Sequence, residues 1–382
     1  MLSEQDKKWA EEVWRKIDRR METVSRRSAQ KLPFFSHDGK HNDMSETDIN
    51  CWTNGFWPGL MWLLYSAEKK DCYRQAALWG EEALDRALLN HTGLSHDVGF
   101  IWRLASGFDY TLTGSKEARN RQFRAADHLM SRYNPVGGFI RAWNHGDYNP
   151  ALAGVTIIDC MMNLPLLYWT SEETGDPRFR FVAQNHADMV LRDHFRPDGS
   201  VKHIVNHDAN TGEMLGDWDD TQGQGYGHGS SWSRGQAWAL YGMALSYRHT
   251  GEERYLDAAK RSAHYFISAC SLQDWLPLCD FRAPKEPVIY DSSAGACAVC
   301  GLLEIADSVP EYERELYFAA AVKILKAMEE HFADWSPDTD FMIHHATGSY
   351  HNEKDRHVSM IYGDYFFAEA VYKLLKTGNL SW

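Results

Sequence analysis

Leu164-Pro165-Leu166-Leu167-Tyr168-Trp169 begins the most informative unit of this chain, because it reads as an apolar helix. Thr174-Gly175-Asp176-Pro177 follows, and an amphipathic segment then runs from Phe179 to Leu191. Glycine directly after a helix is a common left-handed stop, and Asp-Pro is a common start for the next helix. The unit therefore predicts a helical hairpin whose first helix is buried on most sides.

The same unit recurs along the chain. Short connectors rich in Thr, Gly and acidic residues occur at Glu68–Asp71, Thr113-Gly114, Thr174–Asp176, Thr250–Glu252, Asp307–Glu311 and Thr377-Gly378. Five apolar first helices are followed by amphipathic partners, at residues 72–90, 115–133, 177–194, 252–270 and 310–332. A sixth first helix, near 361–376, lacks a following partner, and an unpaired amphipathic helix lies at 4–30.

Helical hairpins at a period of about 45 to 75 residues indicate either a closed barrel or an open solenoid. Closure is favoured here because the two unpaired end helices complement each other. We predict an all-α protein, an (α/α)6 barrel of six helical hairpins, with residues 1–382 in a single domain.

Composition excludes several classes of protein. The chain has 382 residues, 44% hydrophobic and 24% charged, which suits a folded protein with a sizeable core. No apolar run approaches the roughly 20 residues that span a bilayer, and residues 1–8 lack the apolar core of a signal peptide, so we expect a cytoplasmic location and no membrane contact. The net charge of −13 argues against a nucleic-acid partner, although a few placed cations still allow a small anionic substrate.

The barrel geometry predicts where a site should lie. All inner helices run in the same direction, so the loops before them share one mouth, and helix N-termini favour anions. These loops carry polar and aromatic residues at 52–57, 95–100, 156–159, 230–238, 291–293 and 362–364. Aromatic residues, 13% of the chain, suit stacking on sugars as well as a packed core.

Two mouth aspartates are the strongest candidates for chemistry. Asp97 and Asp159 each open a segment that we expect to be apolar and helical. A carboxylate is costly to bury in such surroundings unless its pKa is being tuned for proton transfer. The alternative is that both are N-caps, since Asp is a favoured N-cap residue.

A second candidate segment is Trp232-Ser233-Arg234-Gly235-Gln236-Ala237-Trp238. A guanidinium at the start of an inner helix could clamp a substrate carboxylate, or could form a structural ion pair with a mouth aspartate. The histidines, among them the pair His344-His345, show no metal-binding pattern, and Cys297 and Cys300 are interpreted as core thiols. His96 could tune Asp97, contact a ligand, or simply pack.

Several motifs, taken together and in this order, resemble one enzyme family. They are Trp52-Thr53-Asn54-Gly55-Phe56-Trp57-Pro58-Gly59, His96-Asp97-Val98-Gly99-Phe100, Ile157-Ile158-Asp159-Cys160 with Asn163-Leu164-Pro165, and the segment from Trp232 to Trp238. From about residue 45 onward, this pattern is similar to the unsaturated glucuronyl hydrolases of glycoside hydrolase family 88.

The resemblance implies an activity. These enzymes hydrate the C4=C5 vinyl ether of an unsaturated uronic acid at the non-reducing end of oligosaccharides made by lyases, without nucleotide, metal or other cofactor. By motif match, Asp159 is the general acid/base and Asp97 supports it. The resemblance also implies substrate contacts, at Trp52, His96, Trp143, His203, Gln224, Arg234 and Trp238.

The neighbouring sugar is less well defined. Some relatives carry S-x-x-S-x-K near the C-terminus, where it contacts a sulfate; here the place reads Ser349-Tyr350-His351-Asn352-Glu353-Lys354, with Asn in place of the second Ser. Ser349 and Lys354 are therefore candidate contacts for a sulfated sugar, or Lys354 lies on a solvated loop.

Other functions remain open at the level of sequence. They are an unsaturated rhamnogalacturonyl hydrolase acting on pectin fragments, an ordinary inverting glycosidase, a sugar epimerase and a non-catalytic sugar-binding barrel. The most consistent prediction is a glucuronyl hydrolase acting on fragments of glycosaminoglycans, as a monomer or a homodimer.

Overall fold

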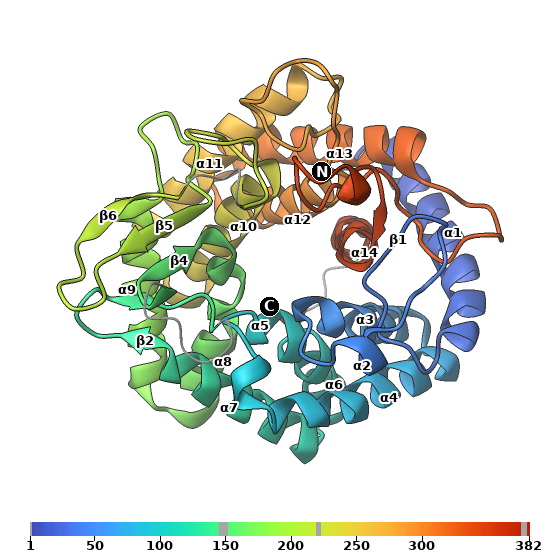
Figure 1. Ribbon diagram of the computed structural model, residues 1–382. Coiled ribbons are helices and arrows are strands. Elements are labelled where there is room, and N and C mark those ends of the chain that lie inside the picture. Colours follow the sequence, from blue (N-terminus) through green and yellow to red (C-terminus); the bar gives the residue numbers. More distant parts are fainter. Residues whose placement is uncertain (1, 145–151, 219–222, 376–379) are drawn as a thin grey trace.

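Twelve long helices build a closed double ring in the computed structural model, which describes residues 2–144, 152–218, 223–375 and 380–382 (Figure 1). The inner ring consists of α3 (Phe56–Glu68), α6 (Ala105–Thr113), α8 (Leu164–Thr174), α10 (Ser233–Thr250), α12 (Ser292–Ser308) and α14 (Ile361–Leu375). The outer ring consists of α1 (Glu4–Arg27), α4 (Asp71–Leu88), α7 (Lys116–Ser131), α9 (Pro177–Asp193), α11 (Glu253–Ser271) and α13 (Glu311–Phe332). The predicted (α/α)6 barrel is confirmed, and the six pairs are those that the repeats indicated.

The hairpins end as the connectors predicted. Gly114, Gly175 and Gly251 follow α6, α8 and α10 with φ of 73°, 71° and 69°, and each donates its N–H to the fourth residue before it. Residues other than glycine are disfavoured in this left-handed conformation, because their Cβ atom crowds the backbone. The predicted connector Thr377-Gly378 lies outside the described residues.

Burial distinguishes the two rings. Residues 233–246 of α10 and 292–306 of α12 are buried without interruption, whereas α1 buries only one face, at Ala10, Val13, Trp14, Ile17 and their helical neighbours. An inner helix is covered on every side, so its sequence is apolar or small all round; an outer helix needs only an apolar stripe.

The ends of the chain close the ring. Outer helix α1 lies beside α14 and α3 in Figure 1, and the rings of Trp14 and Tyr372 are 5.8 Å apart. Trp14 also donates its indole N–H to Glu68 at 2.6 Å. Helix α1 therefore packs between α14 at one end of the chain and α3 near the other, as the complementary end helices predicted.

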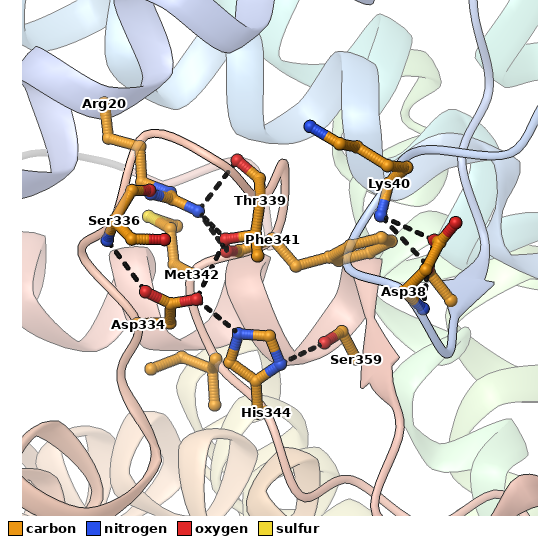
Figure 2. Close-up of polar contacts among 12 residues, drawn as sticks. Arg20, Asp38, Lys40, Asp334, Ser336, Thr339, Phe341, Met342, His344 and Ser359 are labelled. Atoms are coloured by element: carbon orange, nitrogen blue, oxygen red, sulfur yellow. Dashed lines mark hydrogen bonds and ion pairs between the residues drawn. The ribbon is translucent and has the colours of Figure 1, made fainter.

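The loop from residue 333 to 344 is fastened to α1 by polar contacts (Figure 2). Arg20 is buried and donates to the carbonyls of Thr339 and Phe341, at 2.9 and 2.7 Å. His344 lies between Asp334, 3.5 Å away, and Ser359, 2.7 Å away. These partners account structurally for one of the C-terminal histidines.

Small sheets and turns occupy the loops, which the all-helical prediction did not include. Three antiparallel groups form: β1 (Phe35–Ser36) with β7 (Ser359–Met360), β2 (Tyr133–Asn134) with β3 (Phe139–Ile140), and the order β4 (Val155–Ile157), β5 (Ile204–His207), β6 (Met214–Asp217). Short helices are α2 (Met44–Thr47) and α5 (Val98–Trp102), with 3-10 turns η1 (Trp52–Gly55), η2 (His91–Gly93), η4 (Ile158–Met162) and η6 (Glu353–Asp355).

One local prediction was wrong. The segment around Asp159 was expected to open a helix, but β4 precedes it and Asp159 lies in the 3-10 turn η4; α8 begins only at Leu164. The β-branched residues of β4 pair with β5, a partner some 50 residues further along the chain. Such pairing overrides the local helical pattern. Among the described residues, no helix is long and apolar enough to cross a membrane.

Candidate active site

The loops before the inner helices meet at one end of the barrel, and their aromatic side chains pack together. The ring of Trp52, half-buried in η1, lies 5.4 Å from that of Phe100 and 5.0 Å from that of Tyr362. These three residues precede or begin three different helices. The packing confirms that segments far apart in sequence share one mouth.

Asp159 has the environment of a proton donor. Only 16% of its side chain is exposed, and its Oδ2 has no hydrogen-bond partner among the described residues. Burial raises the pKa of Asp159 to about 6, the nearby charge of Asp97 adds to this rise, and His203 and Arg234 oppose it. A carboxyl group with such a pKa keeps its proton in mildly acidic solution, where an ordinary aspartic acid is already ionised.

His203 faces this carboxyl group. Its Nε2 lies 3.7 Å from Oδ2 of Asp159, and its ring lies 4.2 Å from that of Trp232. The main chain connects the two residues as well, because Ile158 donates its N–H to the carbonyl of His203. The pairing of β4 with β5 therefore sets this contact.

Asp97 is held differently, by hydrogen bonds to both of its oxygens. Ser95 donates to Oδ2 at 3.1 Å and Asn163 donates to Oδ1 at 3.0 Å. His96 places Nε2 3.4 Å from the same Oδ1. His96 is buried, and burial is the main reason that its pKa is lowered.

The N-cap alternative is not what the structure shows for either aspartate. Asp97 occupies the N-cap position of α5 but its side chain makes no capping hydrogen bond, and Asp159 lies inside η4. Asp176 and Asp291, by contrast, do cap α9 and α12 through their side chains. Two carboxyl groups that do not cap are available for other work.

Arg234 forms the structural ion pair that the sequence left as an alternative. The guanidinium is 1% exposed and donates to the buried carboxylate of Asp291. It also donates to Ser293 at 3.0 Å, and to the carbonyls of Thr347 and Gly348 at 2.9 and 3.1 Å. The side chain thus connects α10 to α12 and to the loop after α13. Direct binding of a substrate carboxylate by Arg234 stays a prediction.

Trp238 lies in the core behind the mouth. Its ring has no exposed surface and packs between Phe100 and Phe366, at centroid distances of 5.1 and 5.5 Å. Because no part of the ring is exposed in this structure, the predicted sugar contact of Trp238 stays a prediction. The ring packs behind Phe100, which in turn contacts Trp52 at the mouth.

Trp143 and Gln224 are two further candidates. Trp143 is half-buried with its ring 6.3 Å from Trp218, a residue that the sequence analysis did not identify. Gln224 donates to Gly348 at 3.0 Å, which joins the loop before α10 to the loop before α14.

The two sulfate candidates differ in exposure. Ser349 donates to Gly223 at 3.3 Å, whereas Lys354 is exposed in η6. Asn352, which stands where some relatives have Ser, accepts from the Lys354 backbone and donates to Asp355 at 2.7 Å. Its side chain is therefore engaged within the turn.

Asn163 and Asp291 are two further residues that sequence reasoning overlooked as parts of the site. Asn163 was present only as part of a motif, and Asp291 only as the end of a mouth loop. Neither carries a local signal, because each matters through partners that lie 57 to 66 residues away.

The histidines, cysteines and acidic residues that the structure describes are not gathered into a metal site. Among the described residues, no group of three or more His, Cys, Asp or Glu is arranged to hold a metal ion. Cys297 and Cys300 are buried on α12 as free thiols, and burial raises their pKa values well above the ordinary range, as expected for core residues.

Comparison with known proteins supplies the family. The sequence profile of Glycosyl Hydrolase Family 88 matches residues 24–368. The chain is 38% identical to the unsaturated glucuronyl hydrolase of Bacillus sp. (strain GL1) over 86% of this chain and 87% of that protein. It is 32% identical to the unsaturated chondroitin disaccharide hydrolase of Streptococcus pneumoniae, covering 97% of this chain and 94% of that one.

Solved structures agree with the sequences. The unsaturated glucuronyl hydrolase of Streptococcus agalactiae superposes with a TM-score of 0.89 at 30% identity, over 100% of this chain and 95% of that one. A second unsaturated glucuronyl hydrolase, described as specific for heparin, gives 0.86 at 27% identity, over 97% and 100% of the two chains. The chain therefore belongs to glycosyl hydrolase family 88.

Proposed function

We propose that this protein is an unsaturated glucuronyl hydrolase, which removes a 4,5-unsaturated glucuronic acid from the non-reducing end of oligosaccharides made by lyases. The observation that carries the proposal is the pair Asp159 and Asp97 in one mouth, in contrasting environments. One carboxyl group is buried with its pKa raised to about 6, and the other is held by donors on both oxygens.

In the proposed reaction, Asp159 gives its proton to C4 of the vinyl ether. Positive charge then develops at C5 and the ring oxygen, and a carboxylate nearby stabilises it. A water molecule adds at C5 and returns a proton to Asp159, which acts first as acid and then as base. The resulting hemiketal opens to a keto uronate and releases the neighbouring sugar as an alcohol.

Asp97 has a supporting role in this proposal. Its orientation is set by Ser95 and Asn163, and its charge contributes to the raised pKa of Asp159. Trp52, His203, Trp143 and Gln224 are proposed to bind the unsaturated sugar from the rim of the mouth. The whole barrel is proposed to act as one catalytic domain, and the cytoplasmic location stays a prediction.

The substrate is proposed to come from glycosaminoglycans. Named relatives include unsaturated chondroitin disaccharide hydrolases, and a Streptococcus agalactiae mutant enzyme of 28% identity, with a TM-score of 0.84, was solved in complex with dGlcA-GalNAc6S. Another structure, at 32% identity and a TM-score of 0.88, is described with dGlcA-Glc-Rha-Glc, so the neighbouring sugar varies among relatives.

The test follows the ultraviolet absorbance of the conjugated double bond during incubation with unsaturated disaccharides of chondroitin, hyaluronan and heparin. Loss of absorbance with the wild type, and none with Asp159→Asn, is the expected result. Turnover confined to pectin-derived disaccharides would replace the glucuronyl assignment with a rhamnogalacturonyl one. No turnover of any unsaturated substrate would overturn the proposed reaction.

A further inference from the structure

Asn163 joins the two aspartates through a single side chain. It is fully buried between η4 and α8. Its Nδ2 donates to Oδ1 of Asp97 at 3.0 Å and to the main-chain carbonyl of Asp159 at 3.3 Å. Its Oδ1 accepts the N–H of Phe100 at 2.9 Å. One amide therefore contacts both segments that carry the proposed catalytic pair.

The orientation of this amide is fixed by its partners. A backbone N–H only donates, so the atom that faces Phe100 must be the oxygen. The nitrogen then faces two oxygens, and both of its hydrogens have an acceptor. With every group satisfied at a buried site, a rotated amide would lose all three hydrogen bonds.

Gly99 makes room for this arrangement. A Cβ at position 99 would lie 2.6 Å from Cα and 2.7 Å from Oδ1 of Asn163. No real side chain tolerates such distances, so glycine is the residue that lets α5 approach Asn163. The glycine of the His96–Phe100 motif is thus required by the close approach of α5 to Asn163 beside the two aspartates.

We infer that Asn163 is the positioning residue of the catalytic pair, an inference that rests on the proposed function. It aims the Asp97 carboxylate and anchors the turn that presents Asp159, so that the acid and its supporting carboxylate keep one relative geometry. Outer hydrogen-bond partners of this kind commonly control activity without touching substrate. A displacement of about 1 Å in a catalytic group can cost on the order of 100-fold in rate.

The first test compares Asn163→Ala and Asn163→Asp with the wild type on an unsaturated disaccharide that the wild type turns over. We expect kcat to fall by about 10- to 100-fold while KM changes by less than about threefold, since the side chain does not reach substrate. Asn163→Asp, whether ionised or protonated, cannot donate to both acceptors, so it should lose activity as Asn163→Ala does.

Gly99→Ala tests the same geometry from the opposite side. The added methyl group must displace Asn163. The kcat of Gly99→Ala should therefore fall as that of Asn163→Ala does, and its KM should stay close to that of the wild type. This variant keeps every polar group of the site, and it remains informative if a change at Asn163 prevents folding.

Tyr73→Phe is the matched control. Tyr73 on α4 is also fully buried, and its hydroxyl donates to Asp18 of α1 at 2.8 Å, so the change removes a buried hydrogen bond between two helices of the outer ring. It should lower Tm while kcat stays within about threefold of the wild type.

The outcomes separate the two proposals. An inactive wild type would refute the function, whereas an active wild type with folded Asn163→Ala and Gly99→Ala of unchanged kcat would refute only the positioning role. An equal fall of kcat in Tyr73→Phe would also overturn the positioning role, and so would a rise in KM without any fall in kcat in the Asn163 variants.

Discussion

Asn163 holds Asp97 from a distance of 3.0 Å, although 66 residues separate them in the sequence. Asp159 lies four residues before Asn163 and receives no comparable donor on its Oδ2 from the described residues. The two carboxyl groups therefore share one hydrogen-bonded frame while their surroundings differ. Paired carboxyl groups in unequal environments are how many enzymes divide the work of acid and supporting anion.

The pH dependence of activity should follow the proton on Asp159. Because burial raises its pKa to about 6, the acid form is lost as the pH rises above that value. We expect kcat/KM for an unsaturated disaccharide to fall toward tenfold per pH unit on the alkaline side. A profile that stays flat from pH 5 to pH 8 would contradict this assignment, and initial rates in overlapping buffers measure it.

Asp159→Asn should stabilise the protein in a pH-dependent manner. A carboxyl group whose pKa is raised on folding binds its proton more tightly in the folded state, so stability falls as the pH rises from about 4 to 6 and stays lower above that. Removal of the group should therefore raise the free energy of unfolding by up to about 2 kcal/mol at pH 7.5, and by less at pH 5. Urea unfolding at the two pH values measures the difference.

Asp97→Asn is the contrasting variant. Its side-chain amide keeps only one acceptor oxygen, so either Ser95 or Asn163 loses its partner, and the variant should lower stability by about 1 to 2 kcal/mol at pH 7.5. Stabilisation of both variants by the same amount would show that the two environments do not differ.

Arg234→Ala should be strongly destabilising. The change leaves the buried carboxylate of Asp291 without its cation, which typically costs about 3 to 5 kcal/mol. The double variant Arg234→Ala with Asp291→Ala should lose less than the sum of the two single changes. Thermal unfolding of the three variants measures these losses of stability. Separately, an unchanged KM in folded Arg234→Ala would show that Arg234 does not hold the uronate carboxylate.

The two tryptophans should respond differently to truncation. Trp52 is half-buried at the mouth, so Trp52→Ala should raise KM several-fold with a modest loss of stability. Trp238 has no exposed surface, so Trp238→Ala should lower the free energy of unfolding by about 3 to 5 kcal/mol. Kinetics and denaturant unfolding of both proteins provide the comparison, and a larger loss of stability in Trp52→Ala would contradict the placement.

Lys354 tests the neighbouring sugar. If its exposed ammonium group meets a sulfate, Lys354→Ala should lower kcat/KM for a sulfated disaccharide by about 3- to 10-fold, and leave the unsulfated disaccharide unchanged. Lys40→Ala, at an exposed lysine in a different loop, serves as the control. Equal effects on both substrates would place Lys354 outside the binding site.

Most of the fold could be predicted because its signals are local. Apolar helices alternate with amphipathic ones, and Thr-Gly connectors end them, so the number and pairing of the helices followed from periodicity. The direction of the inner helices then placed Asp97, Asp159 and Trp52 at a common mouth. Whether a helix is buried on one face or on all sides depends on the spacing of its apolar residues, and that spacing can be read from a single sequence.

The chemistry of the site required the folded chain. Pairing of β4 with β5 placed Asp159 in a 3-10 turn beside His203, Asp291 paired with Arg234, and the ring of Trp238 was sealed into the core. These features depend on desolvation and on partners 44 to 66 residues away, and residue type alone specifies neither. The sequence supplied the ionisable groups, and their three-dimensional surroundings set which one keeps its proton.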